Sequence, residues 1–468
     1  MSATAAPAVG ALRREAAPDR GPQAHAAQLL PWLHQRRQQA PRSGRLPRVA
    51  VVGAGITGLG AAHALAGAAE VTLFEADARL GGHANTVPVT LDGVTHGVDT
   101  GFLVFNERTY PLLRDLFQHL QVPVAKSEMS FSVQNLANGL EWSGTDLNGV
   151  FAQRSNLLRP RFWGMLADLM RFNKRCTELA ERGDDAALAE PTAEFLRRER
   201  FGDAFRDGYL LPMVACIWSC PTEQMLRFPI GTLIRFCHNH GLLQVADRPQ
   251  WYTVAGGSAQ YVARLRETIP HVHVAQPVRG VLRQSEGVLL RTDAGTQPFD
   301  AVILATHSDQ ALHLLESPLP RETSLLSALR YQANRAVLHT DVSVLPKRRR
   351  AWAAWNYEAH TALTQQDQRP VCLHYLINKL QPLPWQQPVV VSLNPLREPT
   401  QVIGEFDYAH PVFDEGAVRA QARLAEIQGE GRIWFAGAWT RYGFHEDGLL
   451  SGLTAARAAL AQLERVPA

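Results

Sequence analysis

The fold of this chain is decided by residues 49–82, which read VAVVGAGITGLGAAHALAGAAEVTLFEADARLGG. The apolar start of this stretch predicts a buried strand, the glycine turn from Gly53 to Gly58 predicts a tight bend, and the Ala/Leu-rich segment after it predicts a helix. A second apolar run then ends at the acidic residue Glu75. Strand, glycine turn, helix, strand and acid in this order are typical of a βαβ unit that binds a dinucleotide.

Each part of this unit has a physical role. Gly53 permits the tight turn, Gly55 lets the backbone approach a pyrophosphate, and Gly58 lets the helix pack closely on its strand. The helix begins near Thr57, where free N–H groups and the positive end of the helix dipole favour a phosphate. The Glu75 carboxylate can accept hydrogen bonds from ribose hydroxyls and repels a 2′-phosphate, so the pattern disfavours NADP.

The composition indicates a globular protein of two or three domains. The chain has 468 residues, of which 46% are apolar and 19% are charged. Its net charge of +3 does not indicate a nucleic-acid partner. The five cysteines form no CxxC pair, so we expect no metal site, and their odd number favours a reducing cytoplasm. There is no apolar run of roughly 18 residues, so we predict no transmembrane span.

Three further motifs point from a general dinucleotide to FAD. The segment EADARLGGH, residues 75–83, adds a second glycine pair and an arginine after the acid. With it, the chain resembles the large family of FAD-dependent amine oxidases, protoporphyrinogen oxidases and phytoene desaturases. DTGF at 99–102 resembles the family's loop beside the flavin, and RIWFAGAWTRYGFHEDGLLSG at 432–452 resembles its C-terminal flavin motif. The resemblance covers roughly residues 48–463.

The resemblance implies the cofactor and its contacts. We expect FAD to be bound non-covalently, because no cysteine follows Cys372 to form a thioether near the C-terminus. The residues that the resemblance assigns to cofactor binding are Gly53, Gly55, Ile56, Thr57, Gly58, Glu75, Ala76, Arg79, Gly81, Gly82, His83, Gly101, Phe102, Val278, Gly437, Ala438, Asp447, Gly448 and Leu449.

The expected fold class is α/β with mixed α+β character. A Rossmann-like FAD-binding domain is combined with an interleaved substrate domain of mixed sheet plus helices. The expected divisions are a flexible N-terminal extension or loose helix at 1–45, an FAD-binding domain from 46–105, 248–310 and 425–468, and a substrate domain from 106–247 and 311–424.

A narrower resemblance concerns the substrate. The segments at 346–357 (PKRRRAWAAWNY), 373–383 (LHYLINKLQPL) and 392–395 (SLNP) are similar to a bacterial subgroup of predicted NAD/FAD-binding proteins. Members of this subgroup resemble proteins associated with cyclopropane and methyl-branched fatty-acid synthases, including desaturases of methylated acyl chains. The resemblance implies a lipid substrate and a lipid methyltransferase as a partner.

Three residues are candidates for catalysis. His445 and Glu446 lie beside the expected start of the flavin helix and can act as acid and base, while helix capping explains them equally well. His410 can face the flavin from the substrate domain, although a structural histidine is as good an interpretation. His445 also stands where amine oxidases have their second aromatic ring, which weakens the expectation of an amine cage.

We therefore expect an FAD-dependent oxidoreductase that removes a hydride from a carbon centre onto flavin N5, with oxygen or a quinone as the final acceptor. The preferred substrate is a methylated fatty-acyl chain of a lipid. The alternatives are a flavin-containing amine oxidase acting on a small-molecule amine, and a non-catalytic flavin-binding partner of a lipid methyltransferase. An NAD-only dehydrogenase is disfavoured, because it leaves the C-terminal flavin motif without a purpose.

Contact with the inner face of a membrane is a further expectation. The basic run from Lys347 to Arg350, followed by Trp352 and Trp355, can bind anionic lipid headgroups. We favour the other interpretation, in which a basic turn leads into a sheet and the tryptophans are core residues. Apolar stripes in the helical block 145–245 can cover a lipid-entry channel, but core packing explains any single residue there.

Overall fold

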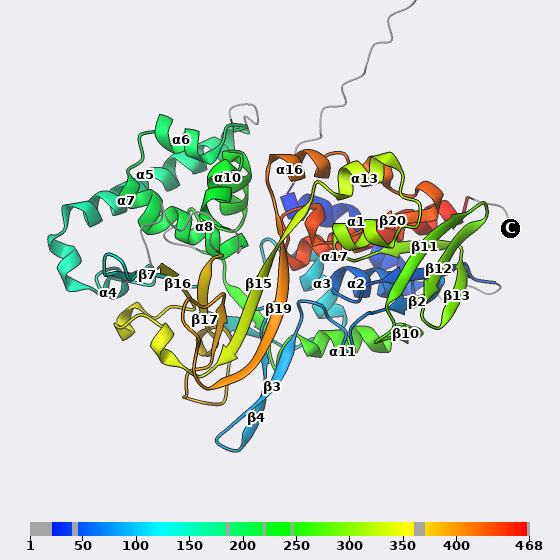
Figure 1. Ribbon diagram of the computed structural model, residues 1–468, viewed down its shortest axis with the longest axis horizontal. Coiled ribbons are helices and arrows are strands. Elements are labelled where there is room, and N and C mark those ends of the chain that lie inside the picture. The colour runs from blue at the N-terminus through cyan, green and yellow to red at the C-terminus, as the bar shows by residue number, and fades with distance from the viewer. Residues whose placement is uncertain are drawn as a thin grey trace, which may run out of the picture.

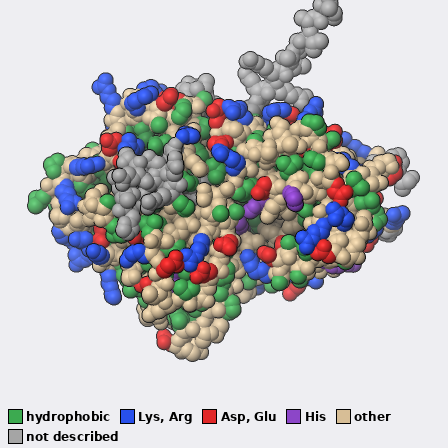
Figure 2. Space-filling model, in the orientation of Figure 1, with side chains coloured by type: hydrophobic (Ala, Val, Ile, Leu, Met, Phe, Trp, Pro, Cys, Tyr) green, Lys and Arg blue, Asp and Glu red, His purple; other side chains and the backbone are tan. Residues whose placement is uncertain are grey.

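The structure is a computed structural model that describes residues 21–39, 45–183, 188–218, 221–244, 248–359 and 370–465 (Figure 1). A parallel sheet and its helices form one lobe, and a helical block forms the other. The two long strands β15 and β19 run between the lobes. Lys and Arg side chains are interspersed with Asp and Glu side chains over the face shown in Figure 2. Among the described residues, no helix is long and apolar enough to span a bilayer.

The sequence motif at 49–82 forms the centre of a five-stranded parallel sheet. The order of its strands is β10, β2, β1, β14 and β20. Their side chains are nearly all buried because helices cover one face and a small antiparallel sheet covers the other. The strands span Arg48–Val52 (β1), Glu70–Phe74 (β2), His271–His273 (β10), Ala301–Leu304 (β14) and Ile433–Phe435 (β20), all inside the three pieces predicted for the FAD-binding domain.

Two helices, α2 (Ile56–Leu65) and α17 (His445–Leu463), pack directly on each other over this sheet. Glycines make the close approach possible. A Cβ atom at Gly452 would lie 2.2 Å from the carbonyl oxygen of Thr57, and one at Gly58 would lie 1.8 Å from that of Gly53. Gly58 therefore has the packing role expected from the motif.

Smaller sheets and helices complete this lobe. Asp92 and Gly93, both with positive φ, form the turn of a β-hairpin. The elements are the hairpin β3 (Thr86–Leu91) and β4 (Val94–Asp99), the antiparallel sheet β11 (Val278–Gln284), β12 (Gly287–Thr292) and β13 (Gly295–Phe299), the sheet β5 (Phe105–Asn106), β9 (Trp251–Val254) and β6 (Val124–Ser127), and the helices α3 (Pro111–His119), α11 (Ala259–Glu267), α12 (Ser308–Leu314) and α13 (Pro320–Leu326).

A seven-stranded mixed sheet forms the base of the substrate domain. Its strand order is β19, β15, β18, β17, β16, β7 and β8. Its strands span Phe131–Asn135 (β7), Leu140–Ser143 (β8), Arg330–His339 (β15), Trp355–Ala359 (β16), Cys372–Leu376 (β17), Val390–Leu393 (β18) and Val402–Val412 (β19), with short helical segments at Val342–Val344 (η3), Arg349–Ala351 (η4) and Ile377–Leu380 (α15).

Alternation along the strands gives this sheet two different faces. One face is apolar and packs under the helical block, with Val133, Tyr357 and Leu373 in the main core. The other face is polar yet buried, with Gln134 and His374 almost without exposure. The segment 341–354 covers this polar face, since the Gln134 side chain donates to the carbonyl of Val344.

Helices cover the apolar face of the sheet and form the left lobe of Figure 1. The structure confirms the mostly helical pattern expected for residues 145–245 within the part of that stretch that it describes. The elements are α4 (Leu147–Val150), η1 (Arg154–Leu158), α5 (Pro160–Arg182), α6 (Thr192–Arg198), α7 (Asp203–Phe205), the π-turn η2 (Arg206–Leu210), α8 (Leu211–Trp218), α9 (Thr222–Arg227) and α10 (Ile230–Asn239). Beyond β19 the chain adds α16 (Glu415–Gln421) and the short turns η5 (Leu424–Ile427), η6 (Glu430–Arg432) and η7 (Ala438–Thr440).

The described part of the N-terminal extension is helical, which is one of the two forms expected for it. Residues Gly21–Gln38 form helix α1, which packs on α17 and α3, so this part is not a flexible extension. Ala26, Leu29 and Leu33 are buried, and Arg37 pairs with Asp115 of α3 at 2.8 Å. The rest of the predicted extension lies largely outside the described residues.

Candidate active site

A single large cavity connects the glycine turn with the helical block. Its volume is about 1310 Å³, which exceeds the roughly 300–1,000 Å³ typical of one ligand pocket. One end is lined by the βαβ unit, the middle by loops of both domains, and the far end by helices α5, α8 and α10. The cavity therefore has room for a dinucleotide and a second molecule.

Most of the residues assigned to cofactor binding lie on the wall of this cavity. They come from four separate parts of the chain, which the fold brings together at one end of the parallel sheet. The lining includes Gly53, Gly55, Ile56, Thr57, Glu75, Ala76, Gly81, Gly82, His83, Gly101, Phe102, Val278, Gly437 and Ala438.

Five of the assigned residues lie behind the wall instead. Gly58 packs inside the turn, and the Arg79 guanidinium donates to the carbonyls of Gly82 and Ala84, which braces the second glycine pair. Asp447, Gly448 and Leu449 belong to the first turn of α17, where a Cβ at Gly448 would meet the Thr57 hydroxyl at 2.8 Å. For these five residues the structure indicates support of the wall rather than a place in its lining.

The glycine turn leaves space where a pyrophosphate is expected. Gly53 has a φ of +99°, and a Cβ there would lie 2.6 Å from the carbonyl oxygen of Ala305. At Gly55, by contrast, an added Cβ meets no atom within 4 Å, although this glycine lines the cavity. Open space above an extended glycine at a helix N-terminus fits the approach of a phosphate group.

Glu75 is tied to the glycine turn by its own hydrogen bonds. One carboxylate oxygen accepts from the backbone N–H of Ala54 at 2.7 Å, and the other accepts from that of Asp77 at 3.0 Å. The acid is thereby fixed just after β2, where it lines the cavity. A role toward the ribose hydroxyls stays a prediction.

Six histidines line the cavity, and four of them, His83, His307, His410 and His445, lie close to one another. Burial lowers the pKa of each of these four, so all four rings are neutral near pH 7. His83 Nε2 is buried without a hydrogen-bond partner in the protein. A buried polar atom beside a cavity is expected to find its partner in a ligand, so this ring nitrogen fits a bound polar ring system.

His445 lies at the start of α17 against Phe102. The two rings are stacked with centroids 3.7 Å apart, and His445 Nε2 lies 3.1 Å from the hydroxyl of Tyr261. Burial lowers the pKa of His445 to about 3. The ring is therefore neutral near pH 7, and one of its nitrogens is free to accept a hydrogen bond while the other carries the hydrogen.

His410 approaches the same region from β19. Its Nδ1 lies 2.8 Å from the side-chain nitrogen of Asn334, and burial, with a contribution from His307, lowers its pKa to about 4. Its ring centroid is 5.3 Å from that of His83. The structure thus brings together His410 and His445, both predicted as catalytic candidates, with two further histidines.

Glu446 does not lie where a catalytic acid or base would have to lie. Its carboxylate accepts hydrogen bonds from the backbone N–H groups of Leu112 and Leu113, at 2.8 and 2.9 Å, and so caps α3. It is buried and does not line the cavity, and burial raises its pKa to about 8. The structure therefore supports the capping interpretation over an acid/base role.

Asp99, in the DTGF motif, is a structural residue that the sequence left unexplained. It accepts hydrogen bonds from the backbone and hydroxyl of Ser258 and from the side chains of Thr86 and Gln381. Burial raises its pKa to about 6. The acid thus joins β4, the 256–258 turn and α15, and this holds Gly101 beside the His83 loop.

The far end of the cavity is apolar. The acidic residues that line the cavity, Glu75, Asp77 and Asp309, come from the Rossmann lobe, whereas Arg248 is a basic residue near the helical block. None of the described residues lining the arm inside the helical block is acidic. Its walls include Trp142, Phe151, Leu166, Leu169, Met213 and Ile217.

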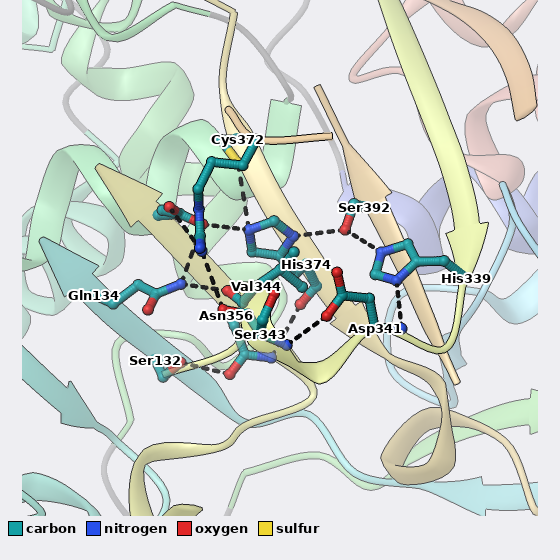
Figure 3. A network of polar contacts seen from close by, with 12 residues as sticks. Ser132, Gln134, His339, Asp341, Ser343, Val344, Asn356, Cys372, His374 and Ser392 are labelled. Atoms are coloured by element: carbon teal, nitrogen blue, oxygen red, sulfur yellow. Dashed lines mark hydrogen bonds and ion pairs between the residues drawn. The ribbon is translucent and has the colours of Figure 1, made fainter. Parts of the chain in front are cut away.

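A polar network lies on the opposite face of the seven-stranded sheet (Figure 3). His374 Nε2 is 2.8 Å from the carboxylate of Glu358 and 3.4 Å from the thiol of Cys372, and its Nδ1 is 2.7 Å from the hydroxyl of Ser392. Ser392 in turn contacts His339. Burial alone lowers the pKa of His374, but Cys372 and Glu358 outweigh burial and raise it to about 9.

Sequence reasoning did not find this network. Glu358 and Cys372 face each other because β16 and β17 pair in antiparallel register, and His374 follows on the same face. The alternation of Asn356 and Glu358 with aromatic residues was the available signal. The ligand-type atoms of Glu358, Cys372 and His374 lie within 4.8 Å of one another, a grouping that the predicted lack of a metal site did not anticipate.

The fold and the cavity define a nucleotide-binding oxidoreductase with a second domain over its cofactor end. Residues 56–353 match the family described as flavin containing amine oxidoreductase. Because this match spans more than half of the chain, the protein belongs to the family of flavin-containing amine oxidoreductases, as the sequence resemblance implied. It is an FAD-dependent oxidoreductase, and FAD is its cofactor.

Three of the proteins that are similar to this chain illustrate the comparison with individual proteins. The carotenoid phi-ring synthase of Streptomyces griseus is 30% identical over 301 residues, which cover 57% of this chain and 53% of that protein. The chain thus spans about half the length of this relative. Cyclohexylamine oxidase from Brevibacterium oxydans IH-35A has a TM-score of 0.63 at 18% identity, over 90% of this chain and 100% of that chain.

The third relative is a CLA-producing fatty acid isomerase from P. acnes. Its solved structure has a TM-score of 0.60 at 14% identity, over 90% of this chain and 99% of that chain. At these identities, the two solved structures show that the fold is shared.

Proposed function

We propose that the protein dehydrogenates a long apolar chain, and that its substrate is a methylated fatty-acyl chain of a lipid. The observation that carries this proposal is the arm of the cavity inside the helical block, which has apolar walls and no acidic residue among the described residues that line it. An acyl chain gains free energy from leaving water for such a wall. An ammonium group would lose its hydration there without a carboxylate to replace it.

The names of two relatives support a substrate of this class. One is a carotenoid phi-ring synthase and the other a fatty acid isomerase, and both names concern long apolar chains. A second candidate function is amine oxidation, which the name of cyclohexylamine oxidase and the many aromatic rings in the cavity favour.

Bound FAD supplies the acceptor for a hydride. The chain's own residues do the rest. The apolar walls hold the acyl chain and exclude water, and the neutral rings of His410 and His445 are each able to take up a proton. Loss of one hydride and one proton from adjacent carbons leaves a carbon–carbon double bond. Oxygen or a quinone would take the two electrons from bound FAD.

Arg248 offers a place for the polar end of the substrate. It is exposed, it lines the cavity beside the apolar arm, and its Nε donates to the carbonyl of Gln244. The remaining guanidinium N–H groups suit a carboxylate or phosphate. An acyl lipid bound with its headgroup at Arg248 would extend its chain along the apolar wall.

The test is anaerobic mixing of the purified holoenzyme with candidate substrates while the flavin absorbance is followed. We expect bleaching with a phospholipid that carries methylated acyl chains and none with cyclohexylamine or putrescine. Product analysis by mass spectrometry should show the loss of two hydrogens from the acyl chain. Rapid bleaching by an amine without bleaching by lipid would replace this function with amine oxidation.

A variant pair locates the substrate in the cavity. Ile217→Trp fills part of the apolar arm and should lower kcat/KM for the lipid about ten-fold or more. Ile403→Trp, on the exposed start of β19, is the matched control and should have no effect. FAD content, read from the absorbance ratio, should be the same in both variants.

A further inference from the structure

The exposed hydrophobic residues of the molecule are concentrated at one place. Among the described residues, eleven large hydrophobic side chains are exposed, and five of them fall within residues 147–170. Leu158 and Leu147 are the most exposed of all, at 87% and 78%. We call these five residues the mouth patch: Leu147, Leu157, Leu158, Trp163 and Met170.

The mouth patch is continuous with the cavity. Leu147, Trp163 and Met170 are exposed on the outside and line the cavity on the inside, so they form the rim of its apolar arm. The Trp163 indole donates to the carbonyl of Leu157 at 2.9 Å, and its ring lies 5.4 Å from that of Phe151. The rim is therefore an ordered part of α4, η1 and α5. An exposed apolar rim does not help the protein to bind a water-soluble substrate.

Positive charge surrounds the same surface. Arg154, Arg159 and Arg161 are exposed between the apolar residues. The two acids of this stretch are engaged within the protein, since Asp146 accepts from the N–H of Gly149 and Asp168 pairs with Arg171. The guanidinium groups of Arg154 and Arg159 donate to the amide oxygens of Asn148 and Asn156, which leaves their charge without a neutralising carboxylate in these contacts. Figure 2 shows basic side chains next to hydrophobic ones at the left edge of the molecule, where α4 and the start of α5 lie.

The basic run at 347–350 adds to this charge. Its short helix η4 contacts α4, so Lys347, Arg349 and Arg350 are exposed on the same side of the molecule as Leu147. Arg348 instead pairs with the buried Glu141 at 2.7 Å. Trp352 is half-buried and donates to the carbonyl of Pro346, while Trp355 lines the cavity. The tryptophans are thus fixed parts of the fold, and only the cations face outward.

We propose that the mouth patch docks on the surface of an anionic phospholipid bilayer. The apolar rim enters the boundary between headgroups and acyl chains, and the two groups of cations bind the phosphates around it. The opening of the apolar arm then faces the membrane. This proposal rests on the proposed function, because it gives an acyl chain a path from the bilayer to the cavity without crossing water.

The test is sedimentation of the holoprotein with vesicles made of equal parts phosphatidylglycerol and phosphatidylcholine. We expect binding to these vesicles, weaker binding to pure phosphatidylcholine, and loss of binding at high salt, since the charges are exposed. Leu157→Asp/Leu158→Asp should lower the partition coefficient by about ten-fold or more. Val94→Asp/Val402→Asp makes the same charge change on exposed residues elsewhere and should bind as the natural protein does.

A second variant tests the cations separately. Arg154→Gln/Arg159→Gln/Arg161→Gln should lower binding by about five-fold per charge. FAD content and melting temperature should be unchanged in every variant, which shows that the fold is intact. No binding by the natural protein, or equal loss in the control pair, would overturn the proposal and favour a protein partner for this surface. Vesicle binding is read without turnover, so a failure of acyl oxidation is distinguishable from a failure of docking.

Discussion

The two faces of the seven-stranded sheet carry buried histidines in opposite states. On the face toward the cavity, His410 has a lowered pKa because burial dominates. On the covered face, His374 is also buried, but Glu358 and Cys372 raise its pKa to about 9. Burial alone therefore does not set the charge of a histidine. The partner on the neighbouring strand decides it.

The difference between the two regions indicates two different roles. The covered face is closed by the segment 341–354, and the hydrogen bonds described there join protein groups to one another, as for Gln134 and Glu358. One Glu358 oxygen, Oε1, has no hydrogen bond there but lies 3.7 Å from the Arg397 guanidinium. The cavity on the other side keeps open space at Gly55 and an unpaired nitrogen at His83, two residues of the Rossmann lobe. We infer that the first region stabilises the fold and that the second is prepared for a ligand.

The largest effect should come from Glu358→Gln. It leaves a charged His374 buried without its counterion, so the free energy of unfolding should fall by about 3 to 5 kcal/mol. Denaturant unfolding followed by tryptophan fluorescence measures the change. Glu398→Gln, which loses an exposed pair with Arg335, is the matched control and should be close to the natural protein. Equal stability of the two variants would show that the covered network contributes nothing.

At Gly55 we expect a substitution to lower the affinity for FAD without lowering the stability of the fold. Gly55→Val adds atoms to open space, so the fold should keep its stability while affinity for FAD falls about 100-fold. Reconstitution of the apoprotein with FAD, followed by fluorescence, measures the affinity. Gly164→Val is a control, because its Cβ also meets no neighbour but lies outside the cavity lining. Unchanged FAD affinity in Gly55→Val would mean that the cofactor does not pass over this residue.

The pH dependence of stability should distinguish the two faces. The pKa of His374 is raised from 6.5 to about 9 in the folded state, so its contribution is full below pH 6.5 and is lost as the pH rises through 9. We expect a decline of about 3 kcal/mol over that range, absent in His374→Asn.

The cavity histidines act at the acid end of the same profile. His410 and His445 have lowered pKa values, so the unfolded chain takes up their protons first and stability falls as the pH drops from 6.5 toward 4. This loss of stability between pH 6.5 and 4 should persist in His374→Asn. If one variant abolished both the acid and the alkaline pH dependence of stability, the assignment of one dependence to each face would be refuted.

The smallest effect should come from Tyr261→Phe. The change removes one hydroxyl next to His445 Nε2 and keeps the ring, so we expect a loss of about 1 kcal/mol in unfolding free energy. FAD content should be unchanged. A shift in the pH profile of flavin reduction would show that the hydroxyl also sets the state of the His445 ring, and an unchanged profile would limit its role to packing.

Local motifs allowed much of the cofactor end to be predicted. The turn from Gly53 to Gly58, the acid Glu75 and the segment around Gly437 each depend on short-range geometry, and the structure places Gly53, Glu75 and Gly437 on the cavity wall. Glu446 was ambiguous because an acid at a helix start is favoured on electrostatic grounds, and only the fold shows that it caps a different helix, α3.

The rest depended on pairing between distant segments. β7 pairs with β16 in parallel register across more than 200 positions, as the Ser132 to Asn356 contact shows, and no local pattern specifies such a register. Helix α1 was left open between a helix and a flexible extension for another reason. Its buried stripe consists of only Ala26, Leu29 and Leu33 in a segment rich in Gln and Arg, so its composition resembled that of an extension.

The contact between α2 and α17 has a consequence for biosynthesis. The N-terminal glycine turn forms early, but the wall above it includes Gly437, Ala438 and His445, and Gly452 packs on Thr57. A chain that is still being synthesised therefore has only part of the wall that binds FAD. FAD uptake has to wait until α17 is made, so the apoprotein meets its flavin in competition with cellular proteolysis. Riboflavin supply would then set how much of the protein accumulates.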